Sequence, residues 1–376
     1  MSILPETDSQ PWYPVTNMDT VDTPALLVYA ERVKQNIQLL KSMVPAVACL
    51  RPHVKTHKML EVSQLLLDAG ITKFKCATIA EAEMLAQVGA PDVLLAYQPV
   101  GPKIYRLLLL VQKYPNTKFS CLVDNETIAQ SIAITFDREN LTLPVYLDLN
   151  VGMNRTGIVP GPEAFALYQA CSQMAGIEPV GLHAYDGHLR QPDITDRKVA
   201  CDKAFEPVLQ LADQIETAGY PTPVIVAGGT PTFPIHAQRP GVECSPGTFV
   251  FWDYGYSTTL TEQPFVYAAL VATRVISRID DQTLCLDLGH KAIAAENPLP
   301  RVIFLNAPEV KPISQSEEHM VVQVPAGNNY QVGDVFYGIP VHICPTCALH
   351  DKAYVVENNQ VKTTWAVVSR NRFITV

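Results

Sequence analysis

Residues 73–89 read KFKCATIAEAEMLAQVG, a short apolar segment followed at once by an amphipathic one. The first part, 73–77, has the length and composition of a β-strand buried on both faces. The second part, 79–88, carries apolar residues at helical spacing, and Gly89 follows it as a typical helix end. This stretch therefore predicts a strand joined directly to a helix, the repeating unit of parallel sheets.

The same alternation continues in both directions, from residue 24 to residue 245. Eight such alternations predict an N-terminal (β/α)8 barrel of the TIM type over residues 23–248. A doubly wound open sheet is the structural alternative. Helical patterns fill the gaps between the predicted strands, which are 24–29, 47–51, 73–77, 93–96, 119–123, 144–149, 179–185 and 224–227.

The pattern changes after residue 248. The segments that follow are β-like, with Gly, Pro and Asn between them and no long helical pattern. We therefore predict a C-terminal antiparallel β domain over residues 249–376, and we expect residues 1–22 to join it. Its predicted strands are 266–278, 284–288, 301–304, 320–324, 335–339, 353–357 and 363–369.

Length and charge narrow the class of protein. The chain has 376 residues, enough for two domains, and a net charge of -9 that disfavours binding to nucleic acid or to an anionic membrane. The longest aliphatic run, 107–111, is far too short to span a bilayer. Nine scattered cysteines and an N-terminus unlike a signal peptide predict a cytoplasmic protein with reduced thiols.

A basic segment follows the second predicted strand, where a barrel carries its reactive groups. Lys55 is its central amine, and like charges packed around it would favour the neutral, nucleophilic form. The alternative is a solvated basic loop or an anion-contact patch. The neighbouring groups are Arg51, His53, His57 and Lys58.

Three further polar segments fall after later predicted strands. The segment 228–230 (GGT) suits a phosphate turn, because the backbone N–H groups of its glycines can approach an anion closely. Taken alone, a glycine pair after a strand is usually an ordinary turn. The other two segments are 154–157 (NRTG) and 185–188 (YDGH).

A possible metal site lies near the C-terminus. His342 and Cys344 are two residues apart, and in an extended segment their side chains would point the same way. Imidazole and thiolate suit zinc, and two protein ligands leave positions open for catalysis. The alternatives are a redox pair of Cys344 with Cys347, two buried thiols, or a structural zinc site.

These motifs resemble those of a known family. RPHVKTHK at 51–58 resembles the lysine motif of the D-threonine aldolase and D-serine dehydratase family, whose members are alanine-racemase-like enzymes dependent on pyridoxal phosphate (PLP). The resemblance covers nearly the whole chain, and implies that Lys55 holds PLP as a Schiff base. The other residues that it assigns to the cofactor are His53, Arg155, Tyr185, Gly229 and Thr230.

The resemblance also implies a metal and a base. His342 and Cys344 would bind a divalent metal (zinc, manganese or magnesium) beside the substrate, and His188 would take a proton from the substrate hydroxyl. Cys347 is a departure without an assigned role. Family members are homodimers, so we expect one here as well.

The implied activity is a PLP-dependent lyase acting on small β-hydroxy-D-amino acids, with aldol cleavage to glycine and an aldehyde favoured by the YxGH motif. Dehydration of D-serine or 3-hydroxyaspartate is the main alternative, since the same lysine and metal could serve it. A metal-free amino-acid racemase and a non-catalytic PLP-binding protein are the remaining alternatives.

Overall fold

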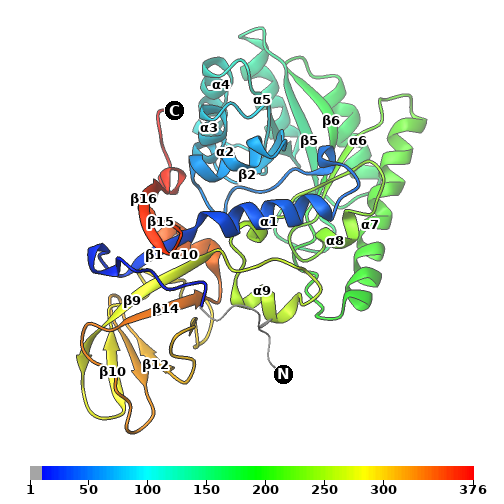
Figure 1. Ribbon diagram of the computed structural model, residues 1–376. Helices are drawn as coiled ribbons and strands as arrows, with labels where there is room; N and C mark the ends of the chain where they lie inside the picture. The colour runs from blue at the N-terminus through cyan, green and yellow to red at the C-terminus, as the bar shows by residue number, and fades with distance from the viewer. Residues whose placement is uncertain (1–10) are drawn as a thin grey trace. The chain divides into compact units, whose positions relative to one another are not determined.

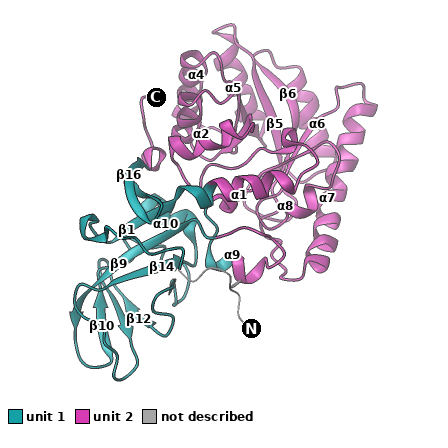
Figure 2. Ribbon diagram, viewed as in Figure 1, with its two compact units in different colours: residues 1–33, 251–255, 267–366 teal, residues 34–250, 256–266, 367–376 magenta. Residues whose placement is uncertain are grey.

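The computed structural model describes residues 11–376, so residues 1–10, which were predicted to join the β domain, lie outside the described part. The chain forms two compact units (Figure 2). The barrel unit comprises residues 34–250, 256–266 and 367–376. The sheet unit contains the described residues up to 33, together with 251–255 and 267–366. Each unit is described by itself below.

The barrel unit is built on a parallel sheet whose seven strands, among residues 11–376, follow one another in chain order. Each strand pairs in parallel with the next, as the alternating sequence pattern predicts. The strands are β2 (Lys73–Cys76), β3 (Asp92–Leu95), β4 (Lys118–Val123), β5 (Leu143–Leu149), β6 (Ile177–Ala184), β7 (Val224–Ala227) and β8 (Val242–Cys244).

A segment without strand conformation joins the two edges of this sheet. Leu50 bridges to β8 at Cys244, and His53 bridges to β2 at Lys75. The segment predicted as a strand at 47–51 is instead a 3-10 helix, η2 (Val47–Cys49), followed by these bridges. The prediction of a TIM-type barrel is thus confirmed, although a 3-10 helix and isolated bridges take the place of the strand expected at 47–51.

Helices follow the strands on the outside of the sheet, and successive helices contact one another (Figure 1). All seven predicted helices are present. Their bounds are α1 (Ala30–Ser42), α2 (Leu60–Asp68), α3 (Ile79–Gln87), α4 (Pro102–Lys113), α5 (Glu126–Asp137), α6 (Pro162–Ser172) and α7 (Ile194–Thr217). Shorter helices that were not predicted are α8 (Phe233–His236), α9 (Tyr254–Thr259), η1 (Met18–Thr20), η3 (Thr248–Val250) and η4 (Val368–Arg370).

Helix α3 shows how the opening stretch sets its own boundaries. The hydroxyl of Thr78 accepts a hydrogen bond from the Glu81 N–H at 3.0 Å, and the Glu81 carboxylate accepts one from the Ala77 N–H at 2.6 Å. This arrangement is similar to a capping box, except that Glu81 accepts from the residue before the N-cap Thr78, and it satisfies two N–H groups at the start of the helix. The buried Glu81 carboxylate also pairs with Lys58, so the cap fixes one end of the basic segment.

The sheet unit holds the remaining strands in a mainly antiparallel sheet, as predicted for the C-terminal part. The sheet covers two apolar clusters, one around Leu284, Leu286 and Phe336 and one around Leu27, Leu270 and Ile339. The strands are β1 (Ala25–Tyr29), β9 (Ala269–Arg278), β10 (Thr283–Leu286), β11 (Val302–Phe304), β12 (Lys311–Gln315), β13 (Met320–Gln323), β14 (Val335–Pro340), β15 (Lys352–Glu357) and β16 (Gln360–Ala366).

Strand β1 corrects one prediction. The apolar run at 24–29 was expected to open the barrel, but β1 pairs with β9 and β15 in the sheet unit. All of its residues are buried, so its composition suits either sheet equally well. The division between the units therefore falls within α1, after residue 33.

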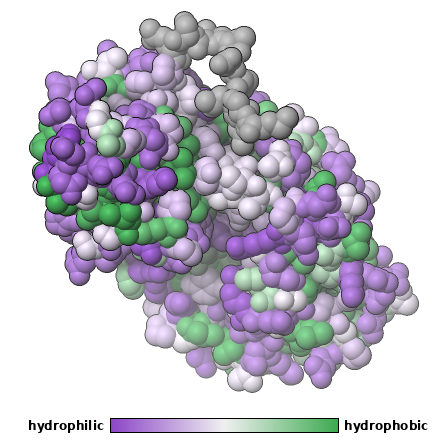
Figure 3. Space-filling view, turned by 90° about the horizontal axis from the view of Figure 1, so that it is seen from below, coloured by the Kyte–Doolittle hydropathy of each residue, from purple (hydrophilic) through white to green (hydrophobic). Residues whose placement is uncertain are grey.

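The surface in Figure 3 has apolar residues interspersed with polar ones. Over residues 11–376, we find no helix of the length and apolar character needed to cross a membrane.

Candidate active site

Lys55 lies in the segment that closes the barrel, but its basic neighbours are not free like charges. Arg51 is buried and forms ion pairs with Asp92 at 2.5 Å and with Glu243 at 2.6 Å. Lys58 pairs with Glu81, as described above. Two of the cations expected to crowd Lys55 are therefore paired with carboxylates, which come from β3, β8 and α3.

The two histidines of the segment shape its backbone. Nδ1 of His53 accepts from the Lys55 N–H at 3.2 Å, and Nδ1 of His57 accepts from the Met59 N–H at 3.1 Å. Burial lowers the pKa of His57 to about 3. Burial and then the charge of Lys55 hold the pKa of His53 well below its usual range. Both rings are therefore neutral acceptors at pH 7.

A cavity of about 260 Å³ opens beside Lys55, and we call it the Lys55 cavity. Four residues expected at the cofactor line it: Lys55, His53, Arg155 and Tyr185. Residues that were not expected line it as well, among them Lys75, Tyr97, Thr156 and His183.

The ring of Tyr185 is the common neighbour of three cations in this cavity. The Nζ atoms of Lys55 and Lys75 lie 5.8 Å and 5.6 Å from the ring centroid, and the guanidinium carbon of Arg155 lies 5.1 Å from it. These are distances at which an aromatic face attracts a cation. The cavity thus places cationic groups around the flat ring of Tyr185, which suits an anionic ring compound such as a pyridine phosphate.

The predicted phosphate turn, 228–230, follows β7 and is tied to the loop after β8. Oγ1 of Thr230 accepts hydrogen bonds from the N–H groups of Gly247 at 3.2 Å and Thr248 at 3.3 Å. Gly229 packs against the Tyr185 ring so closely that a Cβ there would lie 2.9 Å from Cε2. Within the described residues, Oγ of buried Ser245 has no hydrogen-bond partner.

The groups in and around the Lys55 cavity are chemically suited to PLP. The Lys55 cavity offers an amine and cationic groups, and the glycine turn adjoins its aromatic side chain. Ser245, in the loop that is bonded to this turn, offers a buried hydroxyl that a bound polar group would satisfy.

His188 does not line the Lys55 cavity. It is exposed and lines a separate cavity of about 440 Å³, whose other walls are mostly apolar side chains of the loop after β5 and of α7. A Cβ added at Gly152 would lie 2.7 Å from Nε2 of His188, so the imidazole lies close to the backbone of the loop after β5. The role of His188 as a base therefore stays a prediction.

The predicted metal pair belongs to the sheet unit. His342 is the residue before helix α10 (Ile343–Leu349), and Cys344 lies within the helix, so the expected extended segment is wrong. The helix begins there because the carboxylate of Asp253 accepts from the Ile343 N–H at 3.1 Å. Nδ1 of His342 is hydrogen-bonded to Glu296.

The surroundings of His342 suit a cation. Burial acts to lower its pKa, but the hydrogen bonds to Cys344 and Glu296 and the charge of Asp253 outweigh burial and raise that pKa to about 9. Imidazole, thiolate and carboxylate groups together form a donor set that fits zinc and similar divalent metals. Cys347 is buried in α10.

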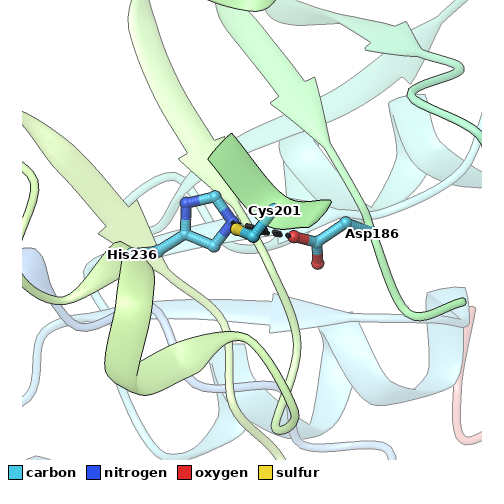
Figure 4. A group of neighbouring side chains, drawn as sticks. All are labelled: Asp186, Cys201 and His236. Atoms are coloured by element: carbon cyan, nitrogen blue, oxygen red, sulfur yellow. Dashed lines mark hydrogen bonds and ion pairs between the residues drawn. The ribbon is translucent and has the colours of Figure 1, made fainter. Parts of the chain in front are cut away.

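A second group of potential ligands lies in the barrel unit and was not predicted (Figure 4). Nε2 of His236 lies 2.8 Å from Oδ2 of Asp186 and 3.3 Å from Sγ of Cys201. Burial and then Asp186 raise the pKa of Cys201 to about 12, so this thiol is protonated in the metal-free protein. Spacing in the sequence gives no signal for it, since the three residues come from separate elements.

Two functional candidates in the Lys55 cavity were also missed, Lys75 and His183. Each lies near the carboxyl end of a strand of the barrel, where reactive groups gather. The available signal was a charged or titratable residue inside an otherwise apolar strand, as Lys75 is between Phe74 and Cys76.

The fold and this cavity define a class of protein, and comparison with known proteins identifies it. The family model "Alanine racemase, N-terminal domain" matches residues 28–255, so the chain belongs to that family. A model for a serine dehydratase domain matches residues 268–356.

Two named relatives cover 96% and 75% of the chain. A D-threonine aldolase from Arthrobacter sp is 27% identical over 369 residues, with 96% of each chain covered. A D-threo-3-hydroxyaspartate dehydratase from Delftia sp. is 28% identical over 289 residues, with 75% of each chain covered. The crystal structure of D-threonine aldolase from Filomicrobium marinum matches with a TM-score of 0.85 and 25% identity, over 97% of this chain and 99% of that one.

Proposed function

We propose that the protein is a PLP-dependent, divalent-metal-assisted lyase that cleaves β-hydroxy-D-amino acids to glycine and an aldehyde. The observation that carries the proposal is the meeting of Lys55, Arg155 and Tyr185 in one cavity. The similarity to a D-threonine aldolase over 96% of the chain supports the aldolase reaction.

Each residue of the Lys55 cavity has a proposed part. Lys55 would hold PLP covalently, Tyr185 and Arg155 would fix the position of its ring, and the turn at Gly229 and Thr230 would bind its phosphate. PLP supplies an electron sink for the bond that breaks at the substrate α-carbon. The protein would select that bond by orienting the substrate, because only a bond aligned with the ring's π system is weakened.

His342 and Cys344 would hold the metal, with Glu296 and Asp253 as nearby acidic groups. A divalent metal acts as a Lewis acid, which lowers the pKa of a bound hydroxyl group and fixes its orientation. Zinc suits the thiolate best, whereas manganese and magnesium prefer oxygen ligands. His188 would receive the hydroxyl proton.

A dehydratase is the second candidate function. It is favoured by the similarity to a D-threo-3-hydroxyaspartate dehydratase, with D-serine or 3-hydroxyaspartate as substrate. In that reaction a base would remove the α-proton and the metal would help the hydroxyl group to leave. A racemase is disfavoured because the metal donor set would have no part in it.

One assay separates the two candidates. The protein loaded with PLP is incubated with D-threonine and with D-serine, before and after removal of metal by a chelator. We expect glycine and acetaldehyde from D-threonine, and loss of this activity on chelation. Ammonia with pyruvate or 2-oxobutyrate would establish the dehydratase instead. Both candidate functions would be contradicted if adding PLP changed the absorbance of neither the unmodified protein nor Lys55→Ala.

The proposal includes a cytoplasmic homodimer. Its support is the scattered cysteine pattern and the family resemblance of the sequence. Sedimentation of the PLP-loaded protein measures the oligomeric state, and a monomer at working concentrations would contradict this part.

A further inference from the structure

Lys75 is a second lysine in the Lys55 cavity. It lies on β2 and is only 2% exposed, yet its amine lines the cavity. Lysine is almost never buried to this degree without a polar partner. Alternation along the strand places Phe74 and Cys76 on the opposite face, so Lys75 points into the barrel interior.

The partner of Lys75 is a histidine that a carboxylate holds in place. Nζ of Lys75 lies 3.4 Å from Nε2 of His183, and Nδ1 of His183 lies 2.8 Å from Oδ1 of Asp148. Asp148 on β5 and His183 on β6 are register partners in adjacent parallel strands. The carboxylate favours the tautomer with its proton on Nδ1, so the Nε2 lone pair faces Lys75.

The Lys75 amine changes its protonation state near neutral pH. Burial and then the charge of Lys55 lower the pKa of Lys75 to about 7. Burial also lowers the pKa of His183, and the charge of Lys75 adds to this. Burial opposes ionisation of Asp148, but the hydrogen bonds from His183 and Thr156, together with the charges of His183 and Lys75, outweigh burial and lower the pKa of Asp148.

Other charged groups face Lys75 from the surrounding elements. Lys55 and Arg51 oppose its protonation, although Arg51 is itself paired with Asp92 and Glu243. Asp148 and Asp186 favour it, and Asp186 is paired with His236. His53 completes the set and is neutral.

We propose that Lys75, His183 and Asp148 form a proton relay in the Lys55 cavity, in which Lys75 is a second acid–base amine distinct from the lysine that holds the cofactor. This inference rests on the proposed role of Lys55. In the relay the Lys75 ammonium gives a proton to Nε2 of His183, and the Asp148 carboxylate stabilises the resulting imidazolium. The neutral Lys75 amine can then accept a proton from a molecule bound in the cavity, and the reverse steps return it.

One consequence can be read from the bound cofactor. A charged Lys75 disfavours a second positive charge nearby, including one on the nitrogen through which Lys55 holds PLP. Absorbance of bound PLP reports the protonation of that nitrogen. We expect Lys75→Met to raise the pH midpoint of this change by about one unit or more.

The matched control is Lys118→Met. Lys118 is an exposed lysine at the start of β4 and does not line the Lys55 cavity. We expect its midpoint to equal that of the unmodified protein. An unchanged midpoint in Lys75→Met, with full PLP binding, would overturn the proposal.

A second measurement uses the protein without PLP, so that failure of the relay and failure of the proposed function remain distinguishable. Nitrogen NMR of ¹⁵N-histidine-labelled protein reports the tautomer and the titration of His183, assigned with His183→Gln. We expect the Nδ1–H tautomer in the unmodified protein and a shift towards Nε2–H in Asp148→Asn.

In the same spectra, Lys75→Met should raise the His183 midpoint, because a neighbouring positive charge has been removed. An Nε2–H tautomer of His183 in the unmodified protein would overturn the relay. Failure of PLP to bind, together with the expected His183 behaviour, would contradict the proposed function and leave the relay standing.

Discussion

Nε of Arg51 lies 2.6 Å from Oε2 of Glu243, and this buried ion pair links the irregular segment that closes the barrel to its last strand, β8. The same guanidinium reaches Asp92 on β3 at 2.5 Å, and Glu243 also pairs with Lys73 on β2. The ion pairs therefore connect both edges of the sheet at the place where regular strand pairing stops.

Arg51→Ala should strongly destabilise the barrel unit. It leaves the buried carboxylate of Glu243 without its guanidinium, and breaking a buried pair in this way typically costs roughly 3–5 kcal/mol. Urea unfolding followed by circular dichroism measures the change. Lys198→Ala is the control, because its pair with Asp202 is exposed and within one helix, and should contribute less than about 0.5 kcal/mol. Equal effects of the two substitutions would contradict the structural role of Arg51.

Gly229→Ala should weaken PLP binding at least tenfold. The added Cβ would lie 2.9 Å from Cε2 of Tyr185, so the ring would have to move from its place in the Lys55 cavity. Titration of the variant with PLP, followed by absorbance, gives the dissociation constant. Gly89→Ala provides the contrast, because its positive φ makes the change costly to stability at a site with nothing within 4 Å of the added atom. Its PLP affinity should be unchanged.

His342→Ala should remove bound metal. The His342 imidazole interacts with Cys344, Glu296 and Asp253. Its loss should reduce metal affinity at least tenfold. Elemental analysis after dialysis measures the stoichiometry. His319→Ala, at an exposed position of the same unit, should keep the full content. We also expect full content in Cys201→Ser, because the Asp186 carboxylate of the group in Figure 4 is already hydrogen-bonded to Cys201, Thr232 and His236. Loss of metal in Cys201→Ser alone would reverse the assignment.

The pH dependence of stability should carry the signature of Lys75. Its pKa is about 7 in the folded protein against 10.5 in its ordinary state, so the unfolded chain binds more protons between these values. The contribution of Lys75 to the free energy of unfolding therefore rises with pH from about 7 to 10.5. The difference between the unmodified protein and Lys75→Met, measured without PLP, isolates it. We expect this difference to grow with pH in that window, and a constant difference would contradict a buried Lys75 amine.

Much of the fold was predictable because strand and helix periodicities are local. Residues 73–89 contain β2 and α3 as predicted, and Thr78 and Glu81 form the N-terminal cap of the helix. The partner of a strand is not local, however. The run at 24–29 reads as a buried strand and is one, but its antiparallel partner β9 begins more than 200 residues later. Strand β8, with three residues, is too short to show a period.

Some residues of the candidate site were likewise predictable from the local sequence, and others were not. Arg155 and Tyr185 were predictable because they follow strands whose carboxyl ends meet at one end of a barrel, and Lys55 was predictable from the basic segment around it. Lys75 and His183 lie within strands, where a polar residue gives no sign of which face it occupies until the register is known. Asp186, Cys201 and His236 come together only through the packing of β6, α7 and α8.

The most direct test of the central claim is to locate the cofactor on the chain. The PLP-loaded protein is reduced with borohydride, digested, and analysed by mass spectrometry. We predict one pyridoxyl modification, on Lys55. Modification of Lys75 in its place, or of neither lysine, would contradict the assignment of Lys55 as the residue that holds PLP.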